Sequence, residues 1–337
     1  MIPSRFAGGI LVFAVLLLLI AVAFLSGHYP VSTRDLLALL WGRLTGVNSD
    51  FDPAIETVVL ELRGPRIAAA LLIGAALAAA GAAYQSLFRN PLVSPDILGV
   101  SAGAAVGAVL GIFFSLSILA VQSVAFVFGL AAVALVYGVA RTVRGHDPLL
   151  VLVLAGVVIG SLLGACVALM KYLADPYHQL PAMTFWLLGS LASASPSDLS
   201  SMLPLLIIGF IPVWLLRWRI NVLSLDDDEA RALGVETARL RPAVIAAATL
   251  MTSASVAVAG VIGWVGLVIP HLARLMVGPE FSRLLPASAL LGAAFLLGTD
   301  TLARSITETE VPLGVLTAFI GTPLFLWQLA AARRSWQ

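Results

Sequence analysis

The residues that could carry out catalysis or hold a metal ion are few and widely spaced. Lysine occurs once, as Lys171 between Met and Tyr, so the chain cannot contain the Gly-Lys-Ser/Thr sequence of a phosphate-binding P-loop. Cysteine also occurs once, as Cys166 in an apolar run, which excludes an internal disulfide, a cysteine zinc site and a cysteine-held iron–sulfur cluster. The histidines stand far apart, at His28, His146, His178 and His271. The sequence therefore predicts neither a catalytic site nor a metal site in this chain.

Two of the histidines lie beside tyrosines, in His28-Tyr29 and Tyr177-His178. Histidine and tyrosine both ligate haem iron, so a haem site is one interpretation. Tyrosine is also common where a helix meets the membrane surface, and two such pairs in loops do not define a site. We therefore interpret both pairs as polar and aromatic residues at the outer surface of the membrane, and His271 as a structural residue.

One polar stretch, from Leu223 to Gly234, has the features of a short helix with defined ends. Asp226 is a favourable N-cap, Glu229 completes a capping-box pair with it, and Gly234 suits a left-handed stop. The acids after Asp226 lie in the first turn, where the helix dipole favours negative charge. Two turns are too short to be stable alone in water. We expect a rigid knob that docks on a partner protein, with a solvated surface loop as the alternative.

The composition places the chain in a membrane. Of its 337 residues 60% are hydrophobic and only 11% are charged, and the mean hydropathy is +1.03. A soluble domain is nearer half apolar and a quarter charged, so this chain could not cover its surface with polar groups in water. The net charge is +1, from 19 Lys and Arg against 18 Asp and Glu. That balance excludes a basic nucleic-acid binder.

Ten segments are apolar over roughly the 20 residues that a helix needs to cross a bilayer. We predict an all-α polytopic membrane protein with one transmembrane domain over 1–337, because no soluble domain fits in the longest polar stretches, 26–66 and 217–242. The first segment is longer than the apolar core of a signal peptide, so we expect a retained span. The predicted spans are Phe6–Leu25, Ile67–Leu87, Ile97–Phe114, Ile118–Ala140, Leu149–Lys171, Ser201–Leu216, Ala243–Gly263, Trp264–Val277, Leu285–Leu302 and Leu313–Ala332.

The basic residues set the expected orientation of these spans. If the N-terminus is inside, only six of the 19 Lys and Arg fall outside, namely Arg34, Arg43, Arg63, Arg66, Lys171 and Arg304. Loops rich in Lys and Arg stay on the cytoplasmic side. We therefore predict that both termini are cytoplasmic, and that the capped helix lies in a cytoplasmic loop.

Glycine spacing predicts close helix contacts. Gly103, Gly107 and Gly111 fall at intervals of four, as do Gly156, Gly160 and Gly164. Each set makes a groove on one helix face against which another helix can pack.

The two halves of the chain also resemble each other weakly. Ala80-Gly81 precedes Pro91 by ten residues, and Ala259-Gly260 precedes Pro270 by ten. The order of a long helix, a loop broken by proline and a short helix therefore recurs. Duplicated halves that enclose a path between them are typical of transporters.

Several motifs together resemble the permease subunits of bacterial ABC importers for iron chelates and cobalamin. The resemblance runs from about residue 63 to residue 323. Its motifs are Arg63-Gly-Pro-Arg66, Gly74 to Gly81, Tyr84-Gln85, Arg89-Asn90-Pro91-Leu92, Pro95, Leu98-Gly99, Arg231-Ala-Leu-Gly234, Gly260-Val-Ile-Gly-Trp-Val-Gly-Leu-Val-Ile-Pro270-His271-Leu-Ala-Arg274, Leu284-Leu285-Pro286, Asp300, Ala303-Arg304, Val311-Pro312-Leu313-Gly314 and Gly321-Thr-Pro323.

The resemblance implies a type II permease fold with about ten spans and two pseudo-repeated halves, in the bacterial inner membrane. It implies a homodimer that works with two ATPase subunits, which bind ATP and Mg, and with a periplasmic or lipid-anchored substrate-binding protein. The chain itself would be no enzyme and would hold no cofactor. The implied cargo is a metal chelate such as a ferric siderophore, haem or cobalamin, moved by alternating access, with molybdate or tungstate as an alternative.

Three groups of residues acquire expected roles from the resemblance. Coupling to the ATPase would use the region 221–242, above all Asp226, Asp227, Asp228, Glu229, Ala230, Arg231, Leu233 and Gly234. Docking of the binding protein would use Arg63, Arg66 and Arg304, whose forked guanidinium groups match carboxylates. A cytoplasmic gate would use Asn90, Leu92, Leu149 and Leu150, although simple proline-marked helix boundaries are an equal alternative.

Two rival functions predict features that the sequence lacks. An ion-coupled secondary transporter usually places ionisable groups near the middle of the membrane, and the nearest candidate here is Asp300. An intramembrane enzyme needs a cluster of acids, nucleophiles or metal ligands within its spans, and we find none in the sequence.

Overall fold

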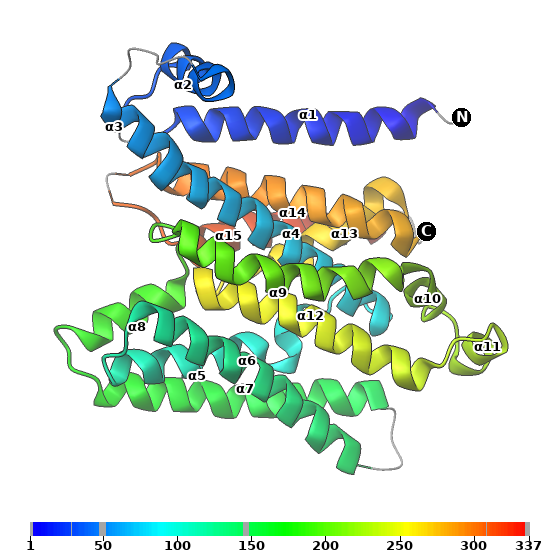
Figure 1. Cartoon of the computed structure of the whole chain (residues 1–337). Coiled ribbons are helices and arrows are strands. Elements are labelled where there is room, and N and C mark those ends of the chain that lie inside the picture. The colour runs from blue at the N-terminus through cyan, green and yellow to red at the C-terminus, as the bar shows by residue number, and fades with distance from the viewer. Residues whose placement is uncertain (1–2, 28, 47–51, 144–147, 308, 334–337) are drawn as a thin grey trace.

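The computed structural model describes residues 3–27, 29–46, 52–143, 148–307 and 309–333, and no strand occurs among them (Figure 1). Within these described ranges, six helices are long and apolar enough to cross a membrane, one of them continuous from 53 to 87, and four shorter helices are also apolar. The elements are α1 (Pro3–Leu25), α2 (Thr33–Thr45), α3 (Pro53–Glu56), a π-helix (Thr57–Arg63), α4 (Gly64–Leu87), a 3-10 turn (Pro95–Leu98), α5 (Val100–Phe113), α6 (Ile118–Thr142), α7 (Pro148–Leu173), α8 (Gln179–Leu188), α9 (Pro196–Leu215), α10 (Arg217–Val222), α11 (Asp227–Ala232), α12 (Thr237–Ala259), α13 (Val265–Val277), α14 (Phe281–Ala303) and α15 (Leu313–Arg333).

Each of the ten predicted spans coincides with a helix, and the differences lie at the ends. The predicted border at Gly263 is wrong, because α12 ends at Ala259 and the chain is not helical again before Val265. Gly260 causes this break: its φ is +70°, and a Cβ there would lie 2.2 Å from the carbonyl oxygen of Trp186. We did not predict α2, α3, the π-helix, α8 or α10 from the sequence.

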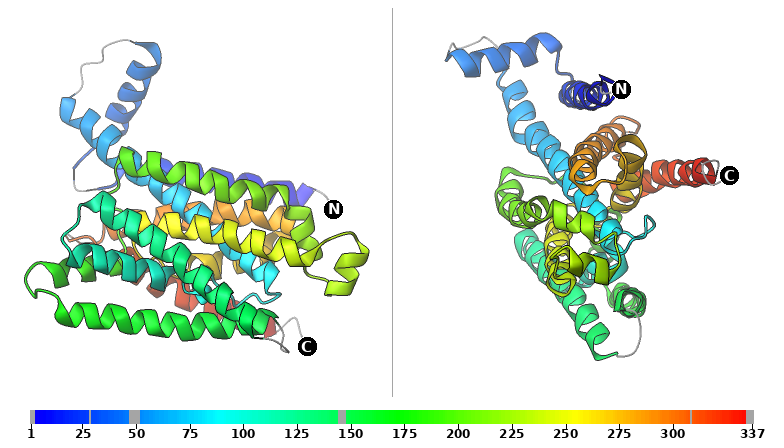
Figure 2. Two further views of the ribbon diagram at one scale, coloured as in Figure 1. Left: turned by 60° about the horizontal axis from the view of Figure 1, so that its bottom comes forward. Right: turned by 90° about the vertical axis from the view of Figure 1, so that its right-hand side faces the viewer.

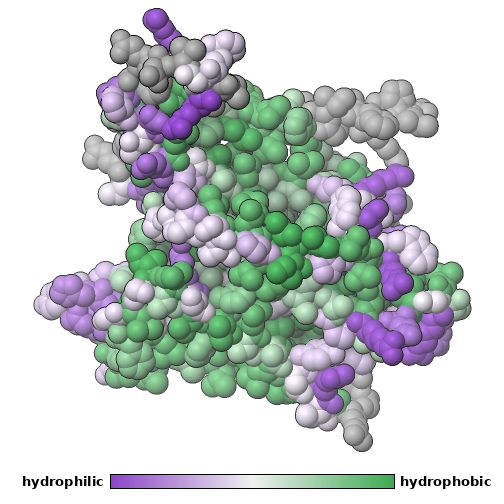
Figure 3. Space-filling view, in the orientation of Figure 1, coloured by the Kyte–Doolittle hydropathy of each residue, from purple (hydrophilic) through white to green (hydrophobic). Residues whose placement is uncertain are grey.

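The surface is arranged for a bilayer. Hydrophobic residues cover the middle of the molecule, and hydrophilic residues gather at its two ends (Figure 3). The start of α1, the end of α15 and the whole of α11 lie at one end, which we call the α11 end, whereas α2 and α8 lie at the opposite end, the α2 end (Figure 1). This arrangement agrees with the predicted placement of both termini beside the capped helix.

Helix α4 is the centre of the packing. It contacts α14, α12, α13 and α9, and it is made largely of buried alanine and glycine. A Cβ at Gly74 would lie 2.3 Å from the carbonyl oxygen of Gly292 in α14, and one at Gly81 would lie 2.0 Å from that of Gly266 in α13. The helices therefore meet backbone to backbone. Such close packing of small residues holds helices together where lipid removes the hydrophobic drive for association.

One of the two predicted glycine grooves is confirmed. Gly103 and Gly107 of α5 receive α6, since a Cβ at either would lie within 2.6 Å of a carbonyl oxygen of that helix. The groove on α7 is formed only at Gly156, which contacts Ile97. At Gly160 and Gly164 of α7 an added Cβ would meet nothing within 4 Å, so no helix of this chain fills the groove there and that part stays a prediction. The face of α7 beyond Gly156 is therefore open in this chain.

The repeated order of elements is present, with one correction. A long helix, a break and a short helix recur as α4, residues 88–99 and α5, and as α12, residues 260–264 and α13. Pro91 lies in the first break, but Pro270 lies inside α13 and breaks nothing. The glycine at 260, with its positive φ, makes the second break instead.

The backbone contact of α4 can be tested with two glycine variants. Gly81→Ala forces α4 and α13 apart, and overpacking of this kind costs about 1–3 kcal/mol. We expect the midpoint of thermal unfolding in detergent to fall by several degrees. Gly138→Ala on α6 is the control, because that position is open, and it should leave the midpoint unchanged or raise it. Equal effects of the two variants would contradict the packing described here.

Candidate functional site

The predicted capped helix exists as α11 and projects from its end of the bundle (Figure 1). It has six residues, begins after Asp226 and carries Asp227, Asp228 and Glu229 in its first turn, as expected. Gly234 has a φ of +77°, and the N–H of Val235 donates to the carbonyl of Ala230 at 3.0 Å, which completes the left-handed stop. The side chain of Ala230 is fully buried, so α11 is seated on the chain by one face.

The opposite face of α11 is available to a partner. Leu233 is 54% exposed and the side chain of Asp228 is 96% exposed, and Glu229, Arg231 and Ala232 are also exposed. Within this face Arg231 pairs with Asp228 at 3.3 Å, one turn away, and both side chains are largely solvated. The outer face of α11 therefore combines an apolar tip with charges of both signs.

The predicted capping-box pair between Asp226 and Glu229 does not form. Asp226 has the backbone of an N-cap, but its side chain caps no backbone N–H of α11. Its carboxylate accepts instead from the guanidinium of Arg89, at 2.9 Å. An arginine that stands 137 residues away along the chain therefore takes the carboxylate that the sequence pattern assigned to local capping.

Two arginines bind the first residues of α11. Arg89, just past the end of α4, contacts Asp226 at 2.9 Å and Asp227 at 3.5 Å. Arg241, near the start of α12, contacts Asp227 at 2.6 Å and is only 17% exposed in its side chain. The two positive and two negative charges balance. We call these four residues the α11 clamp.

The predicted gate residues lie beside this clamp. A cavity of about 570 Å³, the α11 cavity, is lined by all four clamp residues and by Asn90, Leu149 and Leu150. Leu92, the fourth predicted gate residue, is not among its lining residues, but it is 52% exposed and its N–H donates to the side chain of Asn90 at 2.9 Å. The structure thus brings together two groups that the sequence analysis treated separately.

The three arginines of the predicted docking site gather in one buried cluster at the α2 end. Arg66 donates to both oxygens of Asp300, at 2.9–3.1 Å, and to both oxygens of Glu310, at 2.6 and 2.8 Å. Arg63 donates to the carbonyls of Phe24 and Tyr29. Arg304 donates to the carbonyls of Ala23 and Ser26, at the end of α1. The cluster thus joins α1, α4, α14 and the segment that precedes α15.

Burial inside the chain limits the access of a partner protein to the three arginines. Arg63, Arg66 and Arg304 are 6%, 9% and 5% exposed, so each guanidinium is already bound inside the chain. Asp300, the acid nearest to a midplane site in the sequence, is fully buried and paired with Arg66 and Arg304. Glu310 is the most exposed acid of the cluster, at 31% of its side chain. Docking on these arginines stays a prediction.

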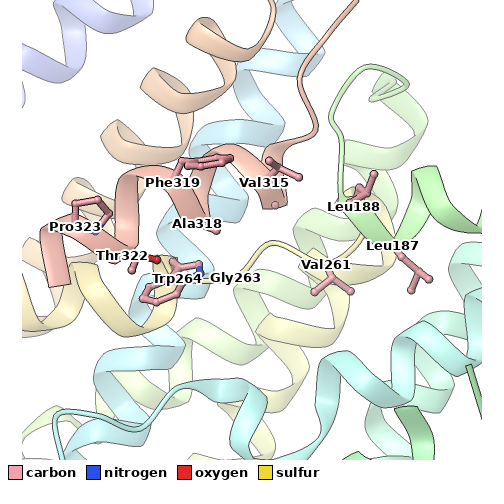
Figure 4. Close-up of a pocket in the computed structure, with 11 residues that line it drawn as sticks. Leu187, Leu188, Val261, Gly263, Trp264, Val315, Ala318, Phe319, Thr322 and Pro323 are labelled. Atoms are coloured by element: carbon pink, nitrogen blue, oxygen red, sulfur yellow. The ribbon is translucent and has the colours of Figure 1, made fainter. Parts of the chain in front are cut away.

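A second cavity of about 700 Å³, the α15 cavity, opens between the end of α8, residues 261–264 and α15 (Figure 4). Its walls are nearly all apolar, and none of its lining residues carries a charge. Trp264 lies beside Thr322, on the same side of the cavity as α15 (Figure 4). Trp264 has a φ of +72°, a conformation that costs energy for any residue with a Cβ. We did not predict a role for this residue, although Gly260, Gly263 and Gly266 around it indicate an unusual backbone.

The histidines do not form a site in the described part of the chain. His28 and His146 lie outside the described residues. His178 pairs with Asp175 at 3.2 Å, and its backbone N–H holds the pKa of that exposed carboxyl below the usual range. His271 faces the ring of Phe325 in α15, with ring centres 6.5 Å apart. No group of three or more possible metal ligands occurs among the described residues.

Comparison with known proteins matches nearly the whole chain. A model of the FecCD transport family matches residues 15–331. The molybdate import system permease protein MolB of Haemophilus influenzae is 40% identical over 325 residues, which cover 94% of each protein. A probable iron chelatin transport system permease protein of Helicobacter pylori is 41% identical over 280 residues, covering 83% of this chain and 84% of that one. A solved metal-chelate type ABC transporter in an inward-facing conformation superposes with a TM-score of 0.85 at 37% identity, covering 95% of this chain and 97% of that one.

The buried cluster at the α2 end can be tested through Asp300. Asp300→Asn removes the carboxylate that Arg66 and Arg304 share; Arg66 keeps Glu310, but Arg304 is left without a charged partner. An unpaired buried charge costs about 3–5 kcal/mol. We expect a marked fall in the midpoint of thermal unfolding in detergent. The control is Glu56→Gln, which breaks the exposed pair with Arg43 and should cost less than about 1 kcal/mol. Two equal falls would contradict a structural role for the cluster.

Proposed function

Because this chain belongs to the FecCD transport family and is a permease of an ABC importer, we propose that it carries a metal chelate into the cytoplasm. The observation that carries this proposal is the α15 cavity. A wall of leucine, valine, phenylalanine and tryptophan without a fixed charge suits a bulky chelate with an organic shell, which must slide past and be released. The named iron chelatin relative supports the same cargo class.

Molybdate is the second candidate cargo. It is favoured by the relative of Haemophilus influenzae, which matches this chain over nearly its full length and is named for molybdate import. A small oxyanion would meet no cation on the walls of the α15 cavity. Molybdate would then pass without binding tightly along the path. The substrate-binding protein that delivers molybdate would select it.

The partner ATPase would bind the outer face of α11. This face offers Leu233 as an apolar tip between the charges of Asp228, Glu229 and Arg231. ATP and Mg would bind on the ATPase, and the present chain would contribute no catalytic group. The α11 end would then be cytoplasmic, in agreement with the excess of basic residues that the sequence places there.

A second copy of the chain would complete the path. Helix α15 stands away from the rest of the bundle (Figure 2) and makes few contacts within the chain. Its Phe319 is 72% exposed and lies on the wall of the α15 cavity, and the open face of α7 carries exposed leucine and valine. We assign these faces to the second copy, so that the two chains enclose a shared path between two ATPases and one binding protein.

Docking of the binding protein at the α2 end would require competition for the arginine cluster. A carboxylate of the partner could reach Arg66 by displacing Glu310, which is partly exposed, rather than Asp300, which is not. Glu310→Gln should then tighten the binding protein, measured by its dissociation constant on the reconstituted permease. Weaker binding in this variant would contradict docking at Arg66.

Transport itself provides the decisive test of the cargo. We would reconstitute the permease with its ATPase and binding protein in liposomes and supply an iron(III) chelate, haem, cobalamin or molybdate. Uptake of a chelate that depends on ATP, supplied on the side of the membrane that carries the ATPase, supports the proposal. Uptake of molybdate alone favours the second candidate. Uptake by the permease without an ATPase would contradict both and favour an ion-coupled secondary transporter.

A variant of α11 tests where the ATPase binds. Leu233→Glu places a charge on the apolar tip, and we expect the amount of ATPase that copurifies with the permease to fall severalfold. The permease should keep its unfolding midpoint, because Leu233 is exposed. Arg283→Glu is the control, since Arg283 is exposed but belongs to α14, outside the predicted coupling region 221–242. Equal losses of ATPase in both variants would place the docking surface elsewhere.

A further inference from the structure

The backbone at Arg89 is unusual for the residue that occupies it. Arg89 follows the last turn of α4 with a φ of +51°, in the left-handed region. The N–H of Asn90 donates to the carbonyl of Gln85 at 3.1 Å, so Arg89 occupies the position that ends a helix in a left-handed stop. Glycine normally fills this position because it has no Cβ to strain. The chain uses glycine for the same purpose at Gly234, after α11.

Strain of this kind persists where the side chain is needed. The side chain of Arg89 makes three contacts, all with the segment that leads into α11. Its Nε donates to the carbonyl of Leu223 at 2.9 Å, and its two terminal nitrogens reach Asp226 and Asp227. Leu223 is 1% exposed, so Arg89 binds a residue of the buried core as well as the projecting helix α11.

A second helix binds the same carboxylate. Arg241 approaches Asp227 from α12 at 2.6 Å. Asp227 therefore lies between the end of α4 and the start of α12, and it is less exposed than either Asp226 or Asp228. The solvated pair of Arg231 with Asp228 lacks this feature, because both partners belong to α11.

We propose that Arg89 and Arg241 are positioning residues that fasten α11 to α4 and α12 through Asp226 and Asp227, so that a push on α11 moves these two helices with it. The proposal rests on the proposed function, because it concerns how the ATPase drives the permease. It assigns to Asp226 and Asp227 an inward role, distinct from the outward docking role of Asp228, Glu229 and Leu233.

The α11 clamp lies next to the predicted gate residues. Asn90 follows Arg89 directly, and its side chain holds the N–H of Leu92. Arg89 and Asn90 line the α11 cavity together with Leu149 and Leu150 from the start of α7. A displacement of α11 would therefore move the end of α4 next to the residues predicted to form the gate.

The left-handed backbone offers a test that separates coupling from folding. Arg89→Gly removes the clamp side chain and relieves the backbone, so the unfolding midpoint should stay the same or rise. In liposomes with the ATPase and binding protein, we expect cargo moved per ATP hydrolysed to fall at least about fivefold, since contacting pairs couple strongly. The ATPase should still copurify in equal amount. Arg283→Ala, which breaks an exposed pair with Glu280, is the control and should change none of these values.

An exchange of charges tests the contact itself. Arg89→Asp alone should uncouple transport from hydrolysis, and Arg89→Asp combined with Asp226→Arg should restore at least half of the transport per ATP. Restoration supports the clamp even if a single variant is also less stable. Transport per ATP that is unchanged in Arg89→Gly, or that is not restored by the exchange, would overturn the proposal. Failure of the wild-type chain to bind any ATPase would instead overturn the proposed function.

Discussion

The structure depends on the close approach of helix backbones to α4. Lipid tails are as apolar as leucine, so burial of apolar surface does not draw helices together in a bilayer, and packing of small residues must do so. At Gly74 and Gly81 the chain of α4 comes so near to Gly292 and Gly266 that no side chain fits between them. This contact fixes α4 against α13 and α14. The residues at the two ends of α4, Arg66 and Arg89, are positioned as a consequence.

The charged clusters at these two ends differ in burial, and this difference suits different tasks. At the α2 end Arg66 is bound to a fully buried Asp300, and its neighbours Arg63 and Arg304 are bound to backbone carbonyls. Such a cluster is costly to open and holds four segments together. At the α11 end the clamp is partly solvated, so it can follow a moving helix without a large penalty. We interpret the first cluster as an anchor and the second as the link through which α11 moves together with α4 and α12.

The sequence predicts the membrane class and the position of every long helix, because an apolar run of about 20 residues has few alternatives in a bilayer. The short helices cannot be predicted in this way, because they contain no apolar run of that length. The start of α2 carries a capping box of Ser32 and Asp35 that the pattern Ser-Thr-Arg-Asp could have revealed. Contacts across the chain are harder: Arg66 meets Asp300 over 234 residues and Arg89 meets Asp226 over 137. Local rules assigned Asp226 to a cap, and a distant arginine outcompeted the backbone for it.

We infer that α11 and the end of α4 move as one body. The most direct measurement is the distance between spin labels at Glu229 and Asn90, in a Cys166→Ser background, with labelled chains diluted among unlabelled ones in the complex with the ATPase. A second pair, Glu229 and Leu150, reports on α7. We expect ATP to leave the first distance unchanged and to shift the second. A shift in the first distance on ATP binding would contradict the account.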